Sequence, residues 1–409
     1  MPRRVTGSVA VGITALVILG IAVFVAVALL RPAPPVRLVH TRLPHAFPGR
    51  GPRLAWPPAG QGSVGVEGVG IIASHDSDQP VPIASVAKIM TAFIVLRDHP
   101  LPLGAEGPLI TVTPADVATY HSDLATGQST AKVQAGERLT ERQALEALLL
   151  PSANNVATLL GEWDAGSELA FVDKMNATAR RLGLVHTHYS DASGYQIETV
   201  STAKDQVRLA MAALRIPTLA AVVAMRRARL PVAGSVHNVD ALLGRRGVIG
   251  VKTGTTSHAG GCFVFAARRL VGHTQVTVIG AVLGQPAAVA TERGLLDSAF
   301  HSTTVLLGSV PRSLRPFRAV VRGRPFARLI APWTRSVPVR LQRTPPLVGW
   351  PGLVAKVRIV AARQFHAPVY AGQRVGTAVI RSGGQRARVA LVAVRDIPDP
   401  SLGWRLTHP

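Results

Sequence analysis

The chain has 409 residues, of which 47% are hydrophobic and 16% are charged, and its formal net charge is +23. This composition excludes a disordered chain, and the length exceeds that of one ordinary domain. The single cysteine, Cys262, excludes both an internal disulfide framework and a metal site built from several thiolates.

The positive charge is concentrated at the two ends of the chain. Residues 61–310 contain twenty basic and twenty acidic side chains, whereas residues 1–60 contain seven Arg and no acidic residue. Residues 311–409 contain eighteen basic residues against Asp396 and Asp399 alone. A nucleic-acid-binding protein usually carries its positive charge on the folded module that reads the nucleic acid, so the neutral middle argues against a nucleic-acid partner.

The first predicted element is a transmembrane helix over residues 8–30. No charged residue lies within it, and a helix of this length spans about 34 Å, enough to cross a hydrocarbon core of about 30 Å. Arg3 and Arg4 before the helix favour a cytoplasmic tail over residues 1–7. A signal peptide is the alternative, because residues 26–28 have the pattern of a cleavage site. The apolar run is long for a signal peptide, which favours an uncleaved anchor.

Residues 31–62 are predicted to form a linker, because they contain eight prolines and no apolar periodicity. Such a stretch favours an extended, semi-rigid spacer. Residues 64–73 are predicted to form a strand, followed by a polar turn at residues 75–79.

The segment Ser85-Val86-Ala87-Lys88 precedes a nearly all-apolar run, residues 89–96, which predicts a buried helix. Residues three apart share a helix face, so Lys88 is expected beside Ser85 at the start of the helix. Free backbone N–H groups are also available there to bind an oxyanion. A hydroxyl, an adjacent amine and nearby donors together suit nucleophilic catalysis.

The Ser-x-x-Lys pattern is weak by itself, because Ser129–Lys132 and Ser201–Lys204 also match it. The first of these leads into residues typical of a strand and a turn, and Ser201-Thr202 is better explained as the N-cap of a following helix. Only Ser85–Lys88 begins a helix that a folded protein would bury, so this pair is favoured as nucleophile and base.

Two further motifs follow in the chain. Ser152-Ala153-Asn154 comes after a predicted helix over residues 141–150 and carries little weight alone. Lys252-Thr253-Gly254-Thr255 occurs once, between residues 247–251 and 260–265. These flanking segments predict the two strands of a hairpin, whose small residues let a substrate approach the strand edge.

In the order Ser-x-x-Lys, Ser-x-Asn and Lys-Thr-Gly, the three motifs form a known catalytic set. The chain therefore resembles the low-molecular-weight serine penicillin-binding proteins, in particular the D-alanyl-D-alanine carboxypeptidases of the serine β-lactamase/transpeptidase-like superfamily. The likeness covers residues 64–308, including Ile89-Met90-Thr91 and His237-Asn238. It implies an α+β catalytic domain over residues 63–308, with an antiparallel sheet flanked by helices and a helical subdomain. A small, basic, β-rich C-terminal domain over residues 312–409 is expected to follow.

Two departures from the family pattern stand out. Ala153 occupies the middle of the second motif, where the family usually has Gly. Residues 196–200 stand where the family often has a Pro-Asp-Gly-like stretch before the helix at Thr202. The first is a mild change in a tight loop, whereas the second lies near the substrate groove and leaves the exact specificity open.

The resemblance implies a role for each residue of the first two motifs. Ser85 attacks the carbonyl of the terminal D-Ala-D-Ala bond of a peptidoglycan stem peptide, and Lys88 takes the hydroxyl proton. Ser152 relays a proton to the leaving D-Ala, and Asn154 holds the substrate amide. An amine with a reference pKa of about 10.4 acts as a base only if its neutral form is favoured, as burial or a neighbouring cation such as Lys252 would do.

The third motif is expected to bind the terminal carboxylate of the substrate through Lys252, Thr253 and Thr255, with Gly254 allowing a close approach. The backbone N–H groups of Ser85 and Thr255 are expected to form an oxyanion hole, where one donor is typically worth about 3–4 kcal/mol of barrier. Water then releases the acyl-enzyme, and no metal or organic cofactor is required. β-Lactam antibiotics are expected to acylate the same serine as inhibitors.

Four other interpretations are weighed against this one. A class A β-lactamase shares the motifs but needs an additional Glu for deacylation, and no Glu-x-x-Leu-Asn stretch lies between Ser152 and Lys252. Endopeptidase action on cross-links stays open, as does a catalytically idle wall- or membrane-binding protein on the same fold. A zinc peptidase is disfavoured, because the thirteen histidines show no His-Glu-x-x-His pattern.

The C-terminal segment alternates apolar residues with Arg, as in residues 386–392, which is the period of strands with one solvated face. Either this face is simply solvated, or its surplus charge meets an anionic wall polymer or lipid headgroups. Together with the N-terminal helix, these expectations describe a single-pass protein of the cell membrane whose catalytic domain lies on the extracytoplasmic side.

Overall fold

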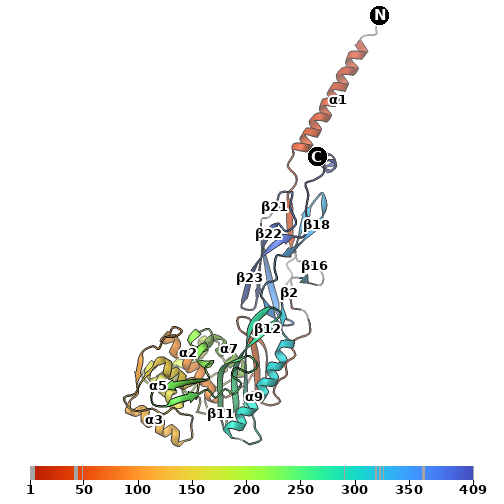
Figure 1. Cartoon of the computed structure of the whole chain (residues 1–409). Helices are drawn as coiled ribbons and strands as arrows, with labels where there is room; N and C mark the ends of the chain where they lie inside the picture. The colour runs from red at the N-terminus through yellow and green to blue at the C-terminus, as the bar shows by residue number, and fades with distance from the viewer. Residues whose placement is uncertain are drawn as a thin grey trace. The chain divides into compact units, whose positions relative to one another are not determined.

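The computed structural model describes most of the chain, and Figure 1 shows its course. Its internal contacts divide the chain into two compact units, here called the α+β unit and the β-rich unit. The α+β unit consists of Pro48–Pro316 and Val348–Leu353, and the β-rich unit of Met1–Phe47, Phe317–Leu347 and Val354–Pro409. The described residues are 5–40, 45–47, 49–289, 291–317, 320–321, 324–325, 327–361 and 364–408.

A five-stranded antiparallel sheet forms the centre of the α+β unit. Its order is β11-β12-β13-β3-β4, so β11 lies at an edge, where a substrate can reach it. The sheet strands are β3 (Gln61–Val66), β4 (Gly70–His75), β11 (Val248–Thr256), β12 (Gly260–Val271) and β13 (Thr274–Gln285). Short strands elsewhere in the unit are β5 (Val81–Pro82), β6 (Leu109–Thr111), β7 (Arg138–Thr140), β8 (Val200–Ser201), β9 (Arg227–Leu230), β10 (Gly234–His237), β14 (Arg315–Pro316) and β19 (Val348–Gly349).

Helices cover both faces of this sheet (Figure 1). α9 (Glu292–Ser309) packs on one face against side chains such as Phe263 of β12. α7 (Ala203–Ala213) packs on the other face, and α2 (Lys88–Asp98) packs beside it. The remaining helices are η1 (Ala84–Ala87), α3 (Pro114–Ala125), α4 (Glu141–Leu149), α5 (Asn154–Ala165), α6 (Glu168–Arg181), α8 (Pro217–Val223) and η2 (Val310–Arg312).

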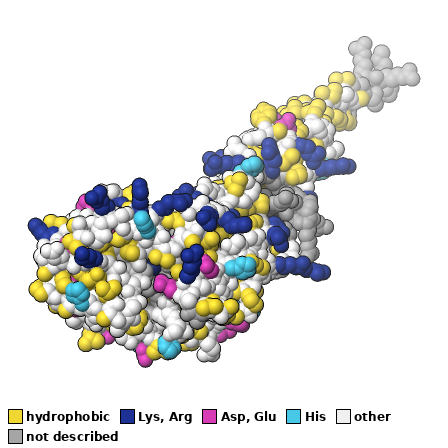
Figure 2. Space-filling view, turned by 60° about the horizontal axis from the view of Figure 1, so that its bottom comes forward, with side chains coloured by type: hydrophobic (Ala, Val, Ile, Leu, Met, Phe, Trp, Pro, Cys, Tyr) yellow, Lys and Arg dark blue, Asp and Glu magenta, His cyan; other side chains and the backbone are white. Residues whose placement is uncertain are grey.

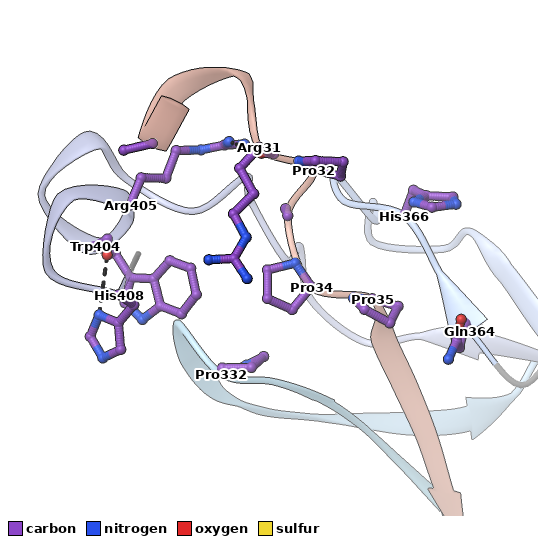
Figure 3. Close-up of a pocket in the computed structure, with 12 residues that line it drawn as sticks. Arg31, Pro32, Pro34, Pro35, Pro332, Gln364, His366, Trp404, Arg405 and His408 are labelled. Atoms are coloured by element: carbon purple, nitrogen blue, oxygen red, sulfur yellow. Dashed lines mark hydrogen bonds between the residues drawn. The ribbon is translucent and has the colours of Figure 1, made fainter. Parts of the chain in front are cut away.

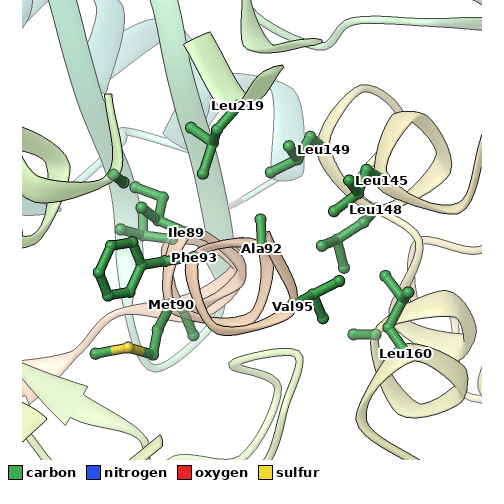
Figure 4. Packing of buried hydrophobic residues seen from close by; sticks show 14 of the residues in the cluster. Ile89, Met90, Ala92, Phe93, Val95, Leu145, Leu148, Leu149, Leu160 and Leu219 are labelled. Atoms are coloured by element: carbon green, nitrogen blue, oxygen red, sulfur yellow. The ribbon is translucent and has the colours of Figure 1, made fainter. Parts of the chain in front are cut away.

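α2 is the central helix of the larger hydrophobic core. Every residue from Lys88 to Leu96 is buried, as the apolar run predicted. Figure 4 shows α2 end-on, with leucines of the neighbouring helices packed around it. A helix enclosed on all sides by close-packed side chains is held rigidly, so the residues at its start are fixed in position. The leucines shown are Leu145, Leu148, Leu149, Leu160 and Leu219.

Hydroxyl side chains cap several helices of this unit. The side chain of Thr202 accepts a hydrogen bond from the Asp205 N–H at 3.2 Å at the start of α7, which confirms the interpretation of Ser201–Lys204 as a helix start. Such a cap is typically worth about 1 kcal/mol. The other caps of this kind are Thr113, Thr140, Ser167 and Thr291.

Two local predictions are wrong. Residues 64–73 are not one strand, because β3 ends at Val66 and β4 begins at Gly70. Gly68 between them has a φ of +69°, which glycine adopts without strain, and the chain reverses there. Residues 133–134, where the strand before a turn was predicted, form no strand, although the turn follows at residues 135–136.

An eight-stranded sheet forms the β-rich unit, in the order β2-β20-β22-β23-β18-β17-β1-β21. Buried and exposed side chains alternate along strands such as β17, which confirms a β-rich C-terminal region with one solvated face. The elements are β1 (Val36–His40), β2 (His45–Ala46), β15 (Val320–Val321), β16 (Arg324–Pro325), β17 (Ala327–Ala331), β18 (Thr334–Leu341), β20 (Val354–Val360), β21 (Gln364–Phe365), β22 (Arg374–Ser382), β23 (Gln385–Ala393) and α10 (Leu402–Thr407).

The predicted linker over residues 31–62 is only partly a spacer. β1 pairs with β17 and β21, and β2 pairs with β20, so this segment contributes two strands to the β-rich unit. Val36 is fully buried there. Pro34 and Pro35 directly precede β1, where their missing N–H groups remove no ladder hydrogen bond. The prolines are therefore compatible with a strand that the composition did not reveal.

The predicted domain boundaries change accordingly. The α+β unit extends beyond residues 63–308 to Pro48–Pro316 and includes Val348–Leu353, whose Trp350 packs in the core under α9. The predicted C-terminal domain, residues 312–409, lacks the two strands that the N-terminal segment supplies.

α1 (Val5–Leu30) is the one unbroken helix among the described residues that is long and apolar enough to cross a membrane. Its mean hydropathy is 3.0 over Ala10–Leu30, and 6% of that window is buried. Arg3 and Arg4, on which the predicted topology rests, lie outside the described residues.

Candidate active site

Ser85 and Lys88 lie where η1 passes into α2. Ala84–Ala87 form a single 3-10 turn, and α2 begins at Lys88. Lys88 Nζ and Ser85 Oγ form a hydrogen bond of 2.9 Å. Ser85 is half-buried and Lys88 is fully buried. The structure therefore brings the amine and the hydroxyl together, as the spacing predicted, although Ser85 itself belongs to the 3-10 turn and not to α2.

Lys88 is surrounded by hydrogen-bond acceptors. Besides Ser85 Oγ, Nζ contacts Asn154 Oδ1 at 2.5 Å and the backbone oxygen of Ser193 at 2.9 Å. Burial lowers the pKa of Lys88 well below its usual value, and the positive charge of Lys252 lowers it further. The neutral form of the amine is therefore favoured.

The second motif, Ser152-Ala153-Asn154, leads into α5. Asn154 is the first residue of α5, and Nδ2 donates to Gln128 Oε1 at 2.6 Å, so Asn154 links Lys88 to the loop that follows α3. Ser152 Oγ is buried and has no hydrogen-bond partner among the described residues. Ser152 also has a φ of +71°, and Ala84 beside the nucleophile has a φ of +47°. Unsatisfied polar groups and left-handed non-glycine residues cost free energy and concentrate at functional sites.

The third motif lies on β11, which runs past the start of η1. A Cβ added to Gly254 would lie 2.9 Å from the backbone N of Ser85 and 3.0 Å from that of Val86. Backbone atoms at that distance cannot be relieved by rotating a side chain, so only glycine permits the approach. Gly254 thus brings the edge of the sheet against the backbone of the nucleophile.

Lys252 is buried on the face of β11 that packs toward α2, because its strand partner Val264 belongs to the core around that helix. Its Nζ donates to the backbone oxygen of Thr253 at 3.1 Å. Burial lowers the pKa of Lys252 to about 7, against the opposing influence of Asp240 and Glu292. This amine is therefore close to the point at which it changes charge at neutral pH.

Thr253 lies next to Lys252 on β11. Side chains alternate along a strand, so Thr253 points to the face opposite Lys252. Its strand partner is Phe263, which belongs to the core under α9. The expectation that Thr253 helps to bind the substrate carboxylate stays a prediction.

A cavity of about 220 Å³ opens beside Ser85. Of the predicted residues, Ser85, Asn154 and Thr255 line it, and Lys88 contacts two of these three. Among the residues that the structure describes, no three His, Cys, Asp or Glu side chains are grouped to hold a metal ion. The other lining residues are Gly127, Gln128, Ser129, Gly194, Tyr195, Thr256, Ser257, Glu292 and Leu295.

Sequence reasoning missed most of these lining residues. Gln128 belongs to no motif, and only the fold reveals its contact with Asn154. Ser129 reaches the cavity although its Ser-x-x-Lys match was set aside, and the matching Lys132 is exposed. Tyr195 directly precedes the 196–200 stretch, so the departure from the family pattern in that stretch was the one available signal.

Comparisons with known proteins agree with this geometry. A profile of the D-alanyl-D-alanine carboxypeptidase family, peptidase family S11, matches residues 66–287. A D-alanyl-D-alanine carboxypeptidase of Streptomyces sp. (strain K15) is 34% identical over 227 residues, which is 51% of this chain and 74% of that protein. A D-alanyl-D-alanine endopeptidase of Pseudomonas aeruginosa is 32% identical over 203 residues, which is 47% of this chain and 62% of that protein.

A solved structure extends the similarity beyond these alignments. The crystal structure of penicillin binding protein 5 from Haemophilus influenzae matches with a TM-score of 0.56, over 86% of this chain and 100% of that one, at 19% identity. The fold is thus that of a penicillin-binding protein, and the predicted fold class is confirmed. The chain belongs to the D-alanyl-D-alanine carboxypeptidase family S11, whose profile covers more than half of it.

Proposed function

We propose that the chain is a serine D-alanyl-D-alanine carboxypeptidase, which removes the terminal D-Ala from peptidoglycan stem pentapeptides through an acyl-enzyme on Ser85. The observation that supports this most is the buried amine of Lys88, 2.9 Å from Ser85 Oγ, at a cavity lined by Asn154 and Thr255. An amine whose neutral form is favoured acts as a general base toward the hydroxyl that it contacts. Family membership and the order of the motifs support the same assignment.

The hydrogen bonds of Lys88 fit this role. A neutral amine has two hydrogens and one lone pair. If the hydrogens go to Asn154 Oδ1 and the Ser193 carbonyl, the lone pair is left for the hydroxyl hydrogen of Ser85. As Ser85 Oγ attacks the carbonyl carbon, its proton moves to Lys88 Nζ.

The resemblance to the family suggests the other roles. Ser152 passes a proton to the amino group of the leaving D-Ala, and Asn154 positions the substrate amide. The protonated form of Lys252 attracts the terminal carboxylate, and Thr255 contacts it from the cavity wall. The backbone N–H groups of Ser85 and Thr255 stabilise the oxyanion. Water then attacks the acyl-enzyme, and β-lactams acylate the same serine because they mimic the scissile amide.

The test is release of D-Ala from a pentapeptide ending in D-Ala-D-Ala by the full chain in detergent. Ser85→Ala is expected to reduce release to background. Ser129→Ala is the matched control, because Ser129 lines the same cavity and begins a competing Ser-x-x-Lys match, and its activity is expected to stay within a few-fold of wild type. Release by Ser85→Ala at the wild-type rate contradicts the proposal. Wall binding by a wild-type chain that releases no D-Ala identifies an idle binding protein.

Endopeptidase action is a second candidate function, favoured by the Pseudomonas aeruginosa relative, which is named an endopeptidase. The acylation step is the same, but the leaving amine belongs to a second stem peptide. The ratio of kcat/KM for a cross-linked muropeptide dimer to kcat/KM for a free pentapeptide decides between the two activities.

The proposed location is the cell membrane, with α1 as a single-pass anchor and the α+β unit on the extracytoplasmic side. At the end of α1, Arg405 Nη1 donates to the backbone oxygens of Leu29 at 3.2 Å and Arg31 at 2.8 Å, which satisfies carbonyls that a helix C-terminus leaves free. Trp404 stacks on His408 beside them, with ring centroids 4.6 Å apart (Figure 3). Trp and Arg at the end of an apolar span are typical of a membrane–water interface.

A further inference from the structure

Five exposed cations form a patch on three neighbouring strands of the β-rich unit. They are Lys356 and Arg358 of β20, Arg381 of β22, and Arg386 and Arg388 of β23. The strands are adjacent in the order β20-β22-β23. We call these five residues the cationic patch. Its members lie on one face of the sheet, because residues two apart on a strand and residues paired across strands share a face.

The strand register places like charges directly opposite one another. Lys356 pairs with Arg381, and Arg381 pairs with Arg386, so three cations form one row across three strands. In the next row, Arg358 and Arg388 flank Val379. Neighbouring strands are about 4.8 Å apart, and like charges directly opposite each other destabilise a sheet. The arrangement therefore opposes folding of the unit.

No acidic side chain offsets this repulsion. Among the described residues of the β-rich unit, no Lys or Arg is paired with a carboxylate, and the side chains of the five patch residues have no hydrogen-bond partner. All the ion pairs between residues that the structure describes lie in the α+β unit. Figure 2 shows the contrast on one face, where Asp and Glu lie mainly on the α+β unit. A row of mutually repelling cations without counter-charges is the pattern of a surface that meets an external anion.

The patch lies at the end of the sheet away from the membrane helix. The cavity in Figure 3 is lined by Ala28 of α1 and by Pro332, so the turn before β18 lies at the end of α1. β18 runs from there to Leu341, which pairs with Leu391, and β23 runs on from Leu391 to Arg386. These twelve strand positions correspond to about 40 Å at about 3.3 Å per residue.

That separation decides between the two partners that composition left open. Lipid headgroups act on exposed charges over about one Debye length, which is about 8 Å at physiological ionic strength. Headgroups around the end of α1 therefore do not reach the cationic patch. We infer that the cationic patch binds a linear anionic polymer of the cell wall, whose phosphate or carboxylate groups repeat along the chain and lie across β20, β22 and β23.

The test uses the full chain in phosphatidylcholine nanodiscs, with two immobilised polymers as probes: poly(glycerol phosphate) and polygalacturonate. They separate phosphate from carboxylate as the source of the anion. Five contacts predict a slope of about −3 to −4 for log K against log salt, by analogy with single-stranded nucleic acids. Affinity for at least one polymer is therefore expected to fall about a hundredfold between about 50 and about 200 mM salt.

The variant Arg381→Gln/Arg386→Gln/Arg388→Gln is expected to reduce the slope by about 2 and weaken binding at least tenfold at low salt. The matched control, Arg215→Gln/Arg227→Gln/Arg229→Gln, removes the same charge from exposed positions of the α+β unit and is expected to bind like wild type. Replacing the three patch arginines with Lys keeps the charge, so this variant is expected to retain most of the slope. It separates loss of charge from a folding defect.

Two outcomes overturn the inference. One is equal binding of the polymers by the patch variant and the control variant. The other is patch-dependent capture of phosphatidylglycerol/phosphatidylcholine vesicles without binding to either polymer, which assigns the patch to a lipid surface. A slope that falls in the patch variant alone supports the inference, and the responding polymer identifies the anion.

Discussion

In the α+β unit, some cations are buried and others are paired with a carboxylate. Lys174 lies 2.9 Å from Asp98 and 2.5 Å from Asp164, and Lys88 and Lys252 are buried beside the cavity. In the β-rich unit, the cations of the patch stand on the solvated face without counter-charges. Burial changes the chemistry of an amine, because it lowers the pKa, whereas exposure leaves its charge free to attract a partner.

The positive charges of the two units therefore serve different purposes. The two buried lysines of the α+β unit contribute to a proposed reaction, and their value lies in how readily they lose a proton. The surplus charge of the β-rich unit is permanent, because most of it is arginine. The proposed activity of the α+β unit is therefore sensitive to the removal of single groups. Anion binding by the β-rich unit is sensitive to the number of charges and to the salt concentration.

The largest expected effect is that of Lys88→Met, which keeps the length of the side chain and removes the amine. Acylation by a fluorescent penicillin is expected to slow by about 10²–10⁴-fold, because the general base is lost. Lys132→Met removes the exposed lysine of a competing motif and is expected to acylate like wild type. Similar rates in both variants contradict the distinction between buried and exposed lysines.

Gly254→Ala tests the close approach of β11 to Ser85. The new methyl group meets the backbone at 2.9–3.0 Å, so we expect slower acylation and a loss of about 1–3 kcal/mol in the free energy of unfolding. Gly308→Ala in α9 meets no atom within 4 Å and is expected to be neutral or stabilising by up to about 1 kcal/mol. Urea unfolding and acylation rates measure both variants, and a wild-type result for Gly254→Ala argues against the tight contact.

The pH dependence of stability tests the burial of Lys252. Its pKa is about 7 in the folded chain and about 10.4 when unfolded, so between these values the unfolded chain binds the extra proton. The contribution of Lys252 to the free energy of unfolding therefore rises with pH from about 7 to about 10.

Burial raises the pKa of Cys262 to about 12. The contribution of this thiol to the free energy of unfolding therefore falls as the pH rises above about 8.5. The measurement is therefore a comparison of urea unfolding between wild type and Lys252→Met at each pH. The wild type is expected to gain stability relative to the variant as the pH rises. A difference that stays constant over this range shows that Lys252 does not titrate there.

The smallest expected effects have opposite signs in the two units. Arg381→Gln removes the middle cation of a like-charged row and is expected to stabilise the β-rich unit by about 0.2–1 kcal/mol at low salt. Arg142→Gln breaks a 3.2 Å pair with Glu146 in α4 and is expected to destabilise the α+β unit by about 0.5 kcal/mol. Hydrogen exchange of peptides from each unit, at low and high salt, measures both changes. If Arg381→Gln destabilises the β-rich unit, repulsion within the row does not oppose its folding.

Local spacing predicted the features that depend on local geometry. The contact between Ser85 and Lys88 follows from three-residue spacing near a helix start, and the Thr202 cap follows from its place before an amphipathic run. The exposed arginines of β23 follow from a period of two. In each case the interacting atoms are a few residues apart, so the sequence alone specifies them.

Long-range pairing could not be predicted in this way. β1 pairs with β17 across most of the chain, and no pattern within five residues specifies such a partner. The contact of Gln128 with Asn154 depends in the same way on how the loop folds. The orientation of Thr253 opposite Lys252 could be predicted locally, because side chains alternate along β11.

The central claim is that Ser85 becomes acylated in a cavity where three distant segments meet. Mass spectrometry of the penicillin-treated chain, intact and after digestion, tests it most directly. The account predicts one adduct, on the peptide that contains Ser85, and none on the Ser85→Ala variant. An adduct on Ser129 or Ser152, or a wild-type chain that acquires no adduct, would contradict it.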